Sequence, residues 1–136
     1  MHQFSLRVYY EDTDLAGIVY YANYLKFIER ARSEWVRGLG VDQVALRAEA
    51  GLVFAVRRVE ADYLLPSYFD DLLVVETSVL AHTGARIVLR QDVCRAGALL
   101  FSAQVTLVCL RLNGAAARLP QALRAAIGIF PPVTVE

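Results

Sequence analysis

The sequence lacks the glycine-rich and serine-centred motifs that identify the commonest enzyme families. It contains no Gly-x-Ser-x-Gly elbow, no Walker phosphate loop and no dinucleotide-binding glycine pattern. Histidine is scarce as well, because only His2 and His82 are present. His2 lies at the terminus and His82 beside a predicted surface turn, so neither is favoured for catalysis. The sequence therefore disfavours a serine hydrolase and a histidine-dependent dehydratase, because it lacks most of the catalytic residues of both classes.

A net charge of one sign is also absent. Fourteen basic and fourteen acidic residues give a formal net charge of zero. The chain thus lacks the basic surface that neutralises a phosphate backbone, and nucleic acid is excluded as a partner. The two cysteines, Cys94 and Cys109, have no metal-ligand spacing around them. We expect them to be free thiols inside strands, and we expect no metal site and no cofactor.

Long hydrophobic runs and a secretory leader are missing too. No apolar run approaches the roughly 18 residues that cross a bilayer, and Met1 leads directly into an alternating pattern. We therefore expect a cytoplasmic protein without a transmembrane segment. With 136 residues and no linker, the chain is predicted to be one domain, residues 1–136. Its apolar fraction of 57% exceeds what one small core absorbs, which favours a homodimer or homotetramer.

Five segments have the character of β-strands. Residues 4–10 alternate strictly, with Phe4, Leu6, Val8 and Tyr10 predicted on one face. Four further segments are rich in branched and aromatic residues and are separated by turns at Pro66-Ser67, Thr83-Gly84 and Ala96-Gly97; they are residues 52–64, 72–81, 86–95 and 98–112. The last three are expected to form an antiparallel meander. A short helix over residues 121–127 is predicted after Pro120.

Residues 21–39 have the period of a long amphipathic helix. The predicted apolar stripe contains Tyr21, Leu25, Ile28, Ala31, Arg32, Trp35, Val36 and Leu39, and glycines follow it. Arg32 is the one charged member, so we expect it to be buried and paired with Glu29 or with a carboxylate from another element. A sheet that curls around this helix buries the stripe. The prediction is an α+β fold of the hotdog type, with a five-stranded antiparallel sheet wrapped around one long helix.

Chemistry is concentrated in the loop before the helix. Glu11, Asp12 and Asp14 are three carboxylates within four residues, and a helix N-terminus would stabilise their charge. The same unpaired N–H groups could stabilise an oxyanion on a thioester carbonyl, so that a neighbouring carboxylate completes a minimal hydrolase. The alternative is that Asp12 and Asp14 only cap the turn and the helix. The spacing alone leaves both interpretations open.

The motifs around this loop resemble those of a known family. They are residues 7–14 (RVYYEDTD), 17–24 (GIVYYANY) and 27–32 (FIERAR), followed by residues 59–63 (VEADY), Pro66 and Asp70-Asp71. This pattern resembles the 4-hydroxybenzoyl-CoA thioesterase family, and within it the bacterial branch of tol-pal system-associated acyl-CoA thioesterases. The likeness extends over nearly the whole chain. It implies a hotdog thioesterase that hydrolyses short-chain, medium-chain or aromatic acyl-CoA to free acid and CoA.

The resemblance also implies roles for particular residues. The essential aspartate of the family falls on Asp14, as nucleophile or general base, and the backbone N–H that polarises the thioester carbonyl falls on Tyr21. Asp12, Thr13 and Gly17 are expected to support this loop. Members of the tol-pal branch usually have histidine where this chain has Tyr21. The substitution keeps the backbone donor but removes any acid-base role of the imidazole.

Four arginines, Arg57, Arg58, Arg86 and Arg90, are the weak candidates for binding the CoA phosphates, because a guanidinium suits phosphate. Glu29 is a rival catalyst, because other hotdog thioesterases place their carboxylate on the long helix. An acyl carrier protein is a possible partner besides acyl-CoA. The competing functions are a non-catalytic acyl-carrier or lipid-binding adaptor with this fold, and a hotdog hydratase or dehydratase.

Overall fold

One antiparallel sheet dominates the fold. The computed structural model describes residues 1–129. Its five long strands are β1 (His2–Arg7), β2 (Leu52–Tyr63), β3 (Leu72–His82), β4 (Arg86–Arg95) and β5 (Ala98–Arg111). They lie in the order β1-β3-β4-β5-β2, and a short strand β6 (Ala116–Ala117) pairs with β5. The predicted five-stranded antiparallel sheet and the meander are confirmed, and only the two-residue β6 was missed.

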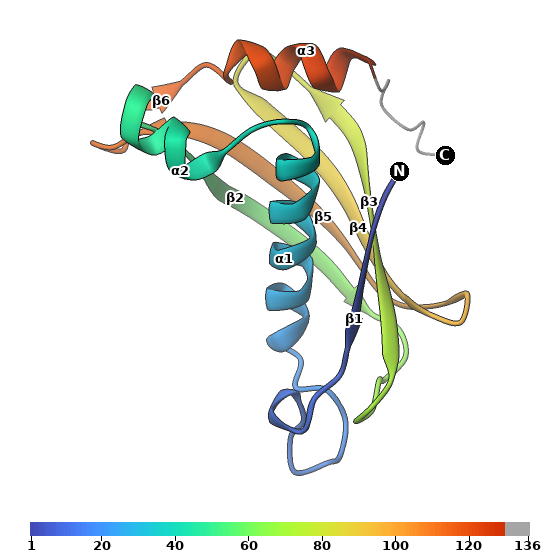
Figure 1. The fold of residues 1–136 in the computed structure, drawn as a ribbon. Helices are drawn as coiled ribbons and strands as arrows, with labels where there is room; N and C mark the ends of the chain where they lie inside the picture. Colours follow the sequence, from blue (N-terminus) through green and yellow to red (C-terminus); the bar gives the residue numbers. More distant parts are fainter. Residues whose placement is uncertain (130–136) are drawn as a thin grey trace.

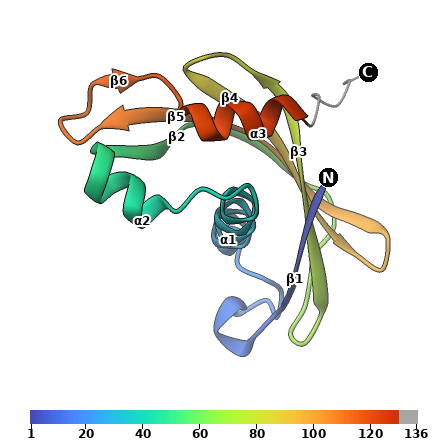
Figure 2. The ribbon, with the colours of Figure 1, turned by 45° about the horizontal axis from the view of Figure 1, so that its top comes forward.

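The sheet curves around one long helix, α1 (Asn23–Gly38), which Figure 2 shows nearly end-on inside the curve. The predicted hotdog arrangement is therefore confirmed. The helix residues that pack against the sheet are Tyr24, Phe27, Ile28, Ala31, Trp35 and Val36. The predicted stripe was wrong at Tyr21 and Leu25, which are 60% and 43% exposed. Because α1 begins at Asn23, Tyr21 lies outside the helix, and Tyr24 and Phe27 take the buried positions instead.

The first strand ends earlier than its alternation predicts. Phe4 and Leu6 face the core and Val8 is fully buried, but Tyr10 is 82% exposed. Tyr10 begins the one-turn 3-10 helix η1 (Tyr10–Asp12), in which the Asp12 carboxylate accepts a hydrogen bond from the Tyr9 N–H at 2.8 Å. This side-chain bond to the backbone competes with strand pairing and turns the chain away from the sheet.

Arg32 was predicted to be buried beside a carboxylate; it is partly buried, and its partner is not a carboxylate. Its Nη1 donates to Oε1 of Gln91 at 3.0 Å, and Gln91 is fully buried in β4. The Gln91 amide nitrogen donates in turn to the Ile28 carbonyl at 2.9 Å and to the Thr77 hydroxyl at 3.0 Å. Burial lowers the pKa of Arg32, and the charge of Glu29 opposes that shift. Glu29 itself accepts a hydrogen bond from Ser33.

The remaining elements close the ends of the sheet. After α1 come a one-turn helix α2 (Gln43–Ala45), capped by Asp42, and the π-helix η2 (Leu46–Ala50), neither of which was predicted. The predicted C-terminal helix is present as α3 (Gln121–Ile129), which runs along the upper end of the sheet in Figure 1. Cys94 and Cys109 are free thiols in strands, as expected. Within residues 1–129, no helix is long and apolar enough to cross a membrane.

Candidate active site

Asp14 opens a tight turn between η1 and α1. Its N–H donates to the Ile18 carbonyl at 3.0 Å, and its carbonyl accepts from the Gly17 N–H at 2.9 Å. Gly17 has a φ of 81°, a conformation that side-chain-bearing residues rarely adopt. The Asp14 Oδ1 accepts a hydrogen bond from the Ala16 N–H at 2.9 Å, while the residue remains exposed. The loop therefore fixes the carboxylate by one oxygen and presents it to solvent.

Asp12 and Thr13 fix the backbone of this loop. The Asp12 carbonyl accepts from the Tyr20 N–H at 2.9 Å and from the Asn23 amide at 2.9 Å. The Thr13 hydroxyl donates to the Tyr10 carbonyl at 2.8 Å, and Thr13 forms an isolated bridge with Val19. Asp12 and Thr13 thus join η1 to the start of α1. The side chains of both residues bond to the backbone of this loop.

One pocket contains both residues predicted to be catalytic. It has a volume of about 460 Å³ and is lined by Asp14, Ile18, Val19, Tyr21, Tyr24, Tyr63, Leu64, Leu65 and Pro66. Nearly all of this lining is aliphatic or aromatic, which suits an acyl group. Asp14 supplies its only carboxylate. The fold therefore brings the predicted catalytic carboxylate beside an apolar pocket.

Tyr21 lies two residues before Asn23, the first residue of α1, and next to the N-cap residue Ala22. The first N–H groups of a helix have no partner within the helix, and the aligned peptide dipoles add a partial positive charge there. Within residues 1–129, the Tyr21 N–H makes no backbone hydrogen bond. The neighbouring phenol is affected by the same residues: the Tyr21 side chain raises the pKa of Tyr20, and the charge of Asp14 adds to the shift.

The loop between β2 and β3 forms the other wall of the site. The Ser67 carbonyl accepts from the Val19 N–H at 2.8 Å, and its hydroxyl shares a buried 2.6 Å hydrogen bond with the Tyr24 phenol. Burial raises the pKa of Tyr24, although Ser67 acts against it. Ser67 therefore connects this wall both to the Asp14 loop and to the first turn of α1.

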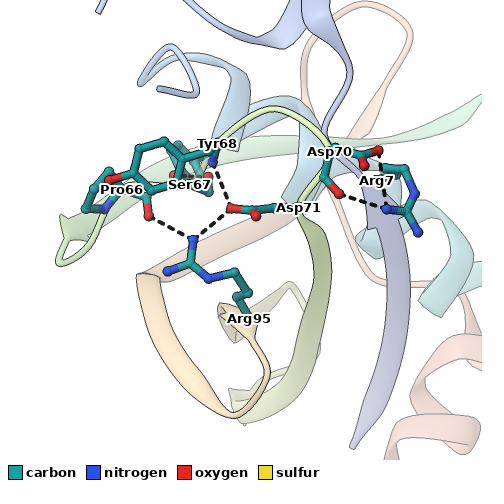
Figure 3. Close-up of polar contacts among 8 residues, drawn as sticks. Arg7, Pro66, Ser67, Tyr68, Asp70, Asp71 and Arg95 are labelled. Carbon is teal, nitrogen blue, oxygen red and sulfur yellow. Dashed lines mark hydrogen bonds and ion pairs between the residues drawn. The ribbon is translucent and has the colours of Figure 1, made fainter. Parts of the chain in front are cut away.

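Arg95, in β4, holds the loop between β2 and β3 in place through hydrogen bonds, as Figure 3 shows. Its Nη1 donates to Oδ2 of Asp71 at 2.7 Å and to the Pro66 carbonyl at 3.3 Å. The same Asp71 oxygen accepts from the Tyr68 N–H at 2.8 Å. Arg7 secures the other end, because its Nη1 donates to the Asp70 carbonyl at 2.7 Å. Sequence reasoning missed Arg95, Ser67 and Arg7 as parts of the site, since nothing in their spacing indicates these long-range contacts.

The four arginines proposed for CoA are not gathered at this pocket. The buried residues of β4 are the odd-numbered ones from 87 to 93, so Arg86 and Arg90 alternate onto the face away from α1. Arg57 and Arg58 lie exposed at a bulge in β2, where Arg58 pairs with Glu60 at 2.5 Å. Within one subunit, these guanidinium groups and Asp14 do not form a common site.

Glu29 lines a separate pocket. This cavity of about 230 Å³ lies between α1 and β2, and Arg32 and Ser33 are among its other lining residues. Glu29 is six residues beyond the start of α1, or roughly 9 Å along the helix axis. Glu29 and Asp14 therefore line different cavities.

Comparison with known proteins places these features in a family. Residues 8–127 match the sequence model of the thioesterase-like superfamily. The acyl-CoA thioesterase YbgC of Haemophilus influenzae is 44% identical over 110 residues, covering 81% of each chain. The acyl-CoA thioester hydrolase YbgC of Escherichia coli O6:H1 is 40% identical over 111 residues, covering 81% of this chain and 82% of that protein.

A similar fold is found among solved structures. The crystal structure of a probable thioesterase from Bartonella henselae superimposes with a TM-score of 0.84 at 37% identity. The match covers 88% of this chain and 98% of that one. The arrangement described above, a curved antiparallel sheet around one helix, is therefore shared with that structure over nearly its full length.

Proposed function

This chain belongs to the thioesterase-like superfamily, and from that premise we propose that it hydrolyses acyl-CoA thioesters with Asp14 as the catalytic carboxylate. The observation that carries the proposal is the pocket in which Asp14 is the only carboxylate among apolar and aromatic walls. An acyl group would occupy this pocket, with its thioester carbonyl between Asp14 and Tyr21. The volume of about 460 Å³ fits a short, medium or aromatic acyl group.

The oxyanion that forms on the thioester carbonyl would be stabilised by the Tyr21 N–H and the N-terminus of α1. Such donors act best when they are already oriented, because the enzyme then spends no energy reorganising them during the reaction. Here the preceding peptide is fixed, since the Tyr20 carbonyl accepts from the Asn23 N–H at 2.9 Å. The tyrosine side chain is not needed for this role, which is why histidine and tyrosine are both compatible with it.

Two chemical routes use the same geometry. In one, an Asp14 oxygen attacks the carbonyl carbon, the C–S bond breaks, and CoA leaves as the thiolate. Water then hydrolyses the mixed anhydride, which releases the acid and restores the carboxylate. In the other, Asp14 takes a proton from a water molecule that attacks directly. A single turnover in ¹⁸O-labelled water tests for the first route, because label enters Asp14 only when an anhydride has formed and water attacks its aspartyl carbonyl.

The central experiment measures CoA release from a series of aliphatic and aromatic acyl-CoA substrates. Asp14→Asn keeps the size of the side chain and removes its charge, so we expect kcat to fall by roughly 10²–10⁴-fold. Tyr21→Phe should stay within a few-fold of wild type, because the backbone donor remains. Glu11→Gln is the matched control, since Glu11 is an exposed carboxylate in the same loop. Substantial activity in Asp14→Asn would mean that this carboxylate only caps the turn. Glu29 would then be the next candidate for the catalytic carboxylate.

The second subunit of a homodimer would complete the pocket. β2 is at one edge of the sheet. Within residues 1–129, no strand pairs with the backbone N–H and C=O groups on its outer side. Its apolar side chains are also exposed, among them Val56, Val59 and Tyr63 at 44%, 39% and 48%. A long apolar edge of this kind is a template for pairing with another chain. Light scattering that showed a stable monomer at micromolar concentration would remove this role for β2.

The remaining partner assignments follow from the substrate. The four arginines stay candidates for CoA phosphates only where a second subunit brings them to the pocket. Parallel assays with acyl-CoA and acyl carrier protein thioesters identify the carrier. The two thiols are unpaired, which agrees with action in the reducing cytoplasm. A hydratase is disfavoured because His82, at the end of β3, is not part of the Asp14 pocket. A non-catalytic adaptor would bind acyl-CoA without releasing CoA in the assay.

A further inference from the structure

Tyr63 joins two parts of the site that are 42 residues apart in the sequence. It is the last residue of β2, and its hydroxyl donates to the Tyr21 carbonyl at 2.9 Å. The centroid of its ring lies 5.0 Å from that of Phe101, the residue of β5 with which it pairs. The centroid of the Tyr24 ring lies 5.6 Å away. The ring is thus held by aromatic packing, while the hydroxyl makes a separate contact with the backbone at the start of α1.

That contact acts on the residue whose N–H faces the proposed oxyanion. The peptide before Tyr21 is held by the Asn23 N–H through the Tyr20 carbonyl. The peptide after Tyr21 is held by the Tyr63 hydroxyl through the Tyr21 carbonyl. Because peptides are planar, fixing the carbonyl on each side restricts both backbone torsions of Tyr21. The orientation of its N–H then depends on both anchors.

We propose that Tyr63 is a positioning residue of the thioesterase site, whose hydroxyl holds Tyr21 in the orientation that presents its N–H to the thioester carbonyl. This inference rests on the proposed function. The carboxylate and the oxyanion donor come from one continuous segment, but the anchor comes from the far end of an edge strand. The packing of β2 against β5 therefore controls the geometry of a site to which β2 contributes no catalytic group.

The protonation state of Tyr63 agrees with this role. A phenol donates to a carbonyl only while it is protonated, and desolvation by its surroundings raises the pKa of Tyr63, with Tyr21 and Tyr24 adding to the shift. The donor is consequently retained throughout the neutral and mildly alkaline range. Phenylalanine at position 63 would pack equally well against Tyr24 and Phe101 but could not donate a hydrogen bond. The proposal therefore explains why this residue has a hydroxyl.

The test is Tyr63→Phe in the full-length protein, assayed for CoA release with the best acyl-CoA substrate. The ring and its packing remain, so KM should stay within about two-fold. Removing an oxyanion donor costs about 10²–10³ in kcat, so loss of the residue that orients it should cost less, roughly 5–30-fold. Tyr68→Phe is the matched control, because Tyr68 is also half-exposed and lies outside the pocket. It should keep the wild-type kcat.

Each outcome is decisive. A lower kcat with unchanged KM and unchanged melting temperature supports positioning. A wild-type kcat in Tyr63→Phe, with or without a lower melting temperature, overturns it, because the hydroxyl would then be only structural. An increase in KM alone would mean that the Tyr63 hydroxyl contributes to acyl binding and not to the orientation of Tyr21, and would also overturn the proposal. Asp14→Asn in the same assay separates the two proposals: if it is inactive while Tyr63→Phe is fully active, only this inference fails.

Discussion

The buried hydrogen bonds of Gln91 offer the sharpest test of how α1 is held in the sheet. Gln91→Met keeps the length of the side chain but removes its amide. Three hydrogen bonds are lost: one from Arg32, one to the Ile28 carbonyl and one to the Thr77 hydroxyl. Gln91 is fully buried and Thr77 is 1% exposed, so water does not replace these partners at no cost.

The magnitude follows from the type of each hydrogen bond. A bond from a charged donor contributes about 1.5–3 kcal/mol and each of the two neutral ones about 1 kcal/mol, so Gln91→Met should cost about 3.5–5 kcal/mol. Arg32→Met leaves the Gln91 oxygen without its partner, at about 1–3 kcal/mol, but it also removes a desolvated charge. We expect its net cost to be about 1–2 kcal/mol. The double variant should lose about 1–2 kcal/mol less stability than the two single variants lose in sum.

Urea unfolding of the wild type, both single variants and the double variant gives this cycle directly. Protein concentration must be the same in all four measurements, because association stabilises an oligomer by mass action. In thermal melts, each kcal/mol corresponds to about 3–5 °C for a chain of this size. The reasoning is refuted if Gln91→Met unfolds at the wild-type urea midpoint. It is also refuted if Arg32→Met costs the same with and without Gln91, because the two side chains would then be energetically independent.

Two further variants address the loops around the pocket. Arg95→Met should cost about 1.5–3 kcal/mol of stability by leaving Asp71 without its ion-pair partner, and should lower kcat/KM by loosening the loop that contains Ser67; unchanged values of both would show that this loop is held by its other contacts. Gly17→Ala should cost about 1–2 kcal/mol because of the φ of 81°, and should reduce kcat by disturbing Asp14. Gly38→Ala, at the end of α1 with open space around it, is the control and should stabilise by about 0.5–1 kcal/mol; equal effects at both glycines would contradict the strain argument.

The local patterns in the sequence were sufficient for the main elements. Segments rich in branched and aromatic residues and bounded by turns placed four of the five long strands to within one residue. The strictly alternating segment 4–10 was placed less well, because the chain leaves the sheet at η1. The motif over residues 7–14 led to Asp14, whose loop is built from contacts between residues close together in sequence. The resemblance to a thioesterase family was confirmed for the same reason, since its motifs are short and continuous.

The predictions were wrong where a distant residue decides the outcome. The helical period could not tell whether Tyr21 or Tyr24 is buried, because that depends on where α1 begins, and the end of the preceding turn sets its start. Arg32 needed a partner, but the amide that serves it is 59 residues away in β4.

The sequence by itself determined the fold class and the family, and it led to the proposal of Asp14 as the catalytic carboxylate, because hydrophobic period and a continuous motif are properties of neighbouring residues. Only the tertiary structure decided what surrounds that carboxylate. Tyr63, Ser67 and Arg95 reach the site from β2, from the loop after it and from β4, through contacts that span between 24 and 43 residues. Such contacts depend on strand order and register, which arise only when the whole sheet has closed around α1.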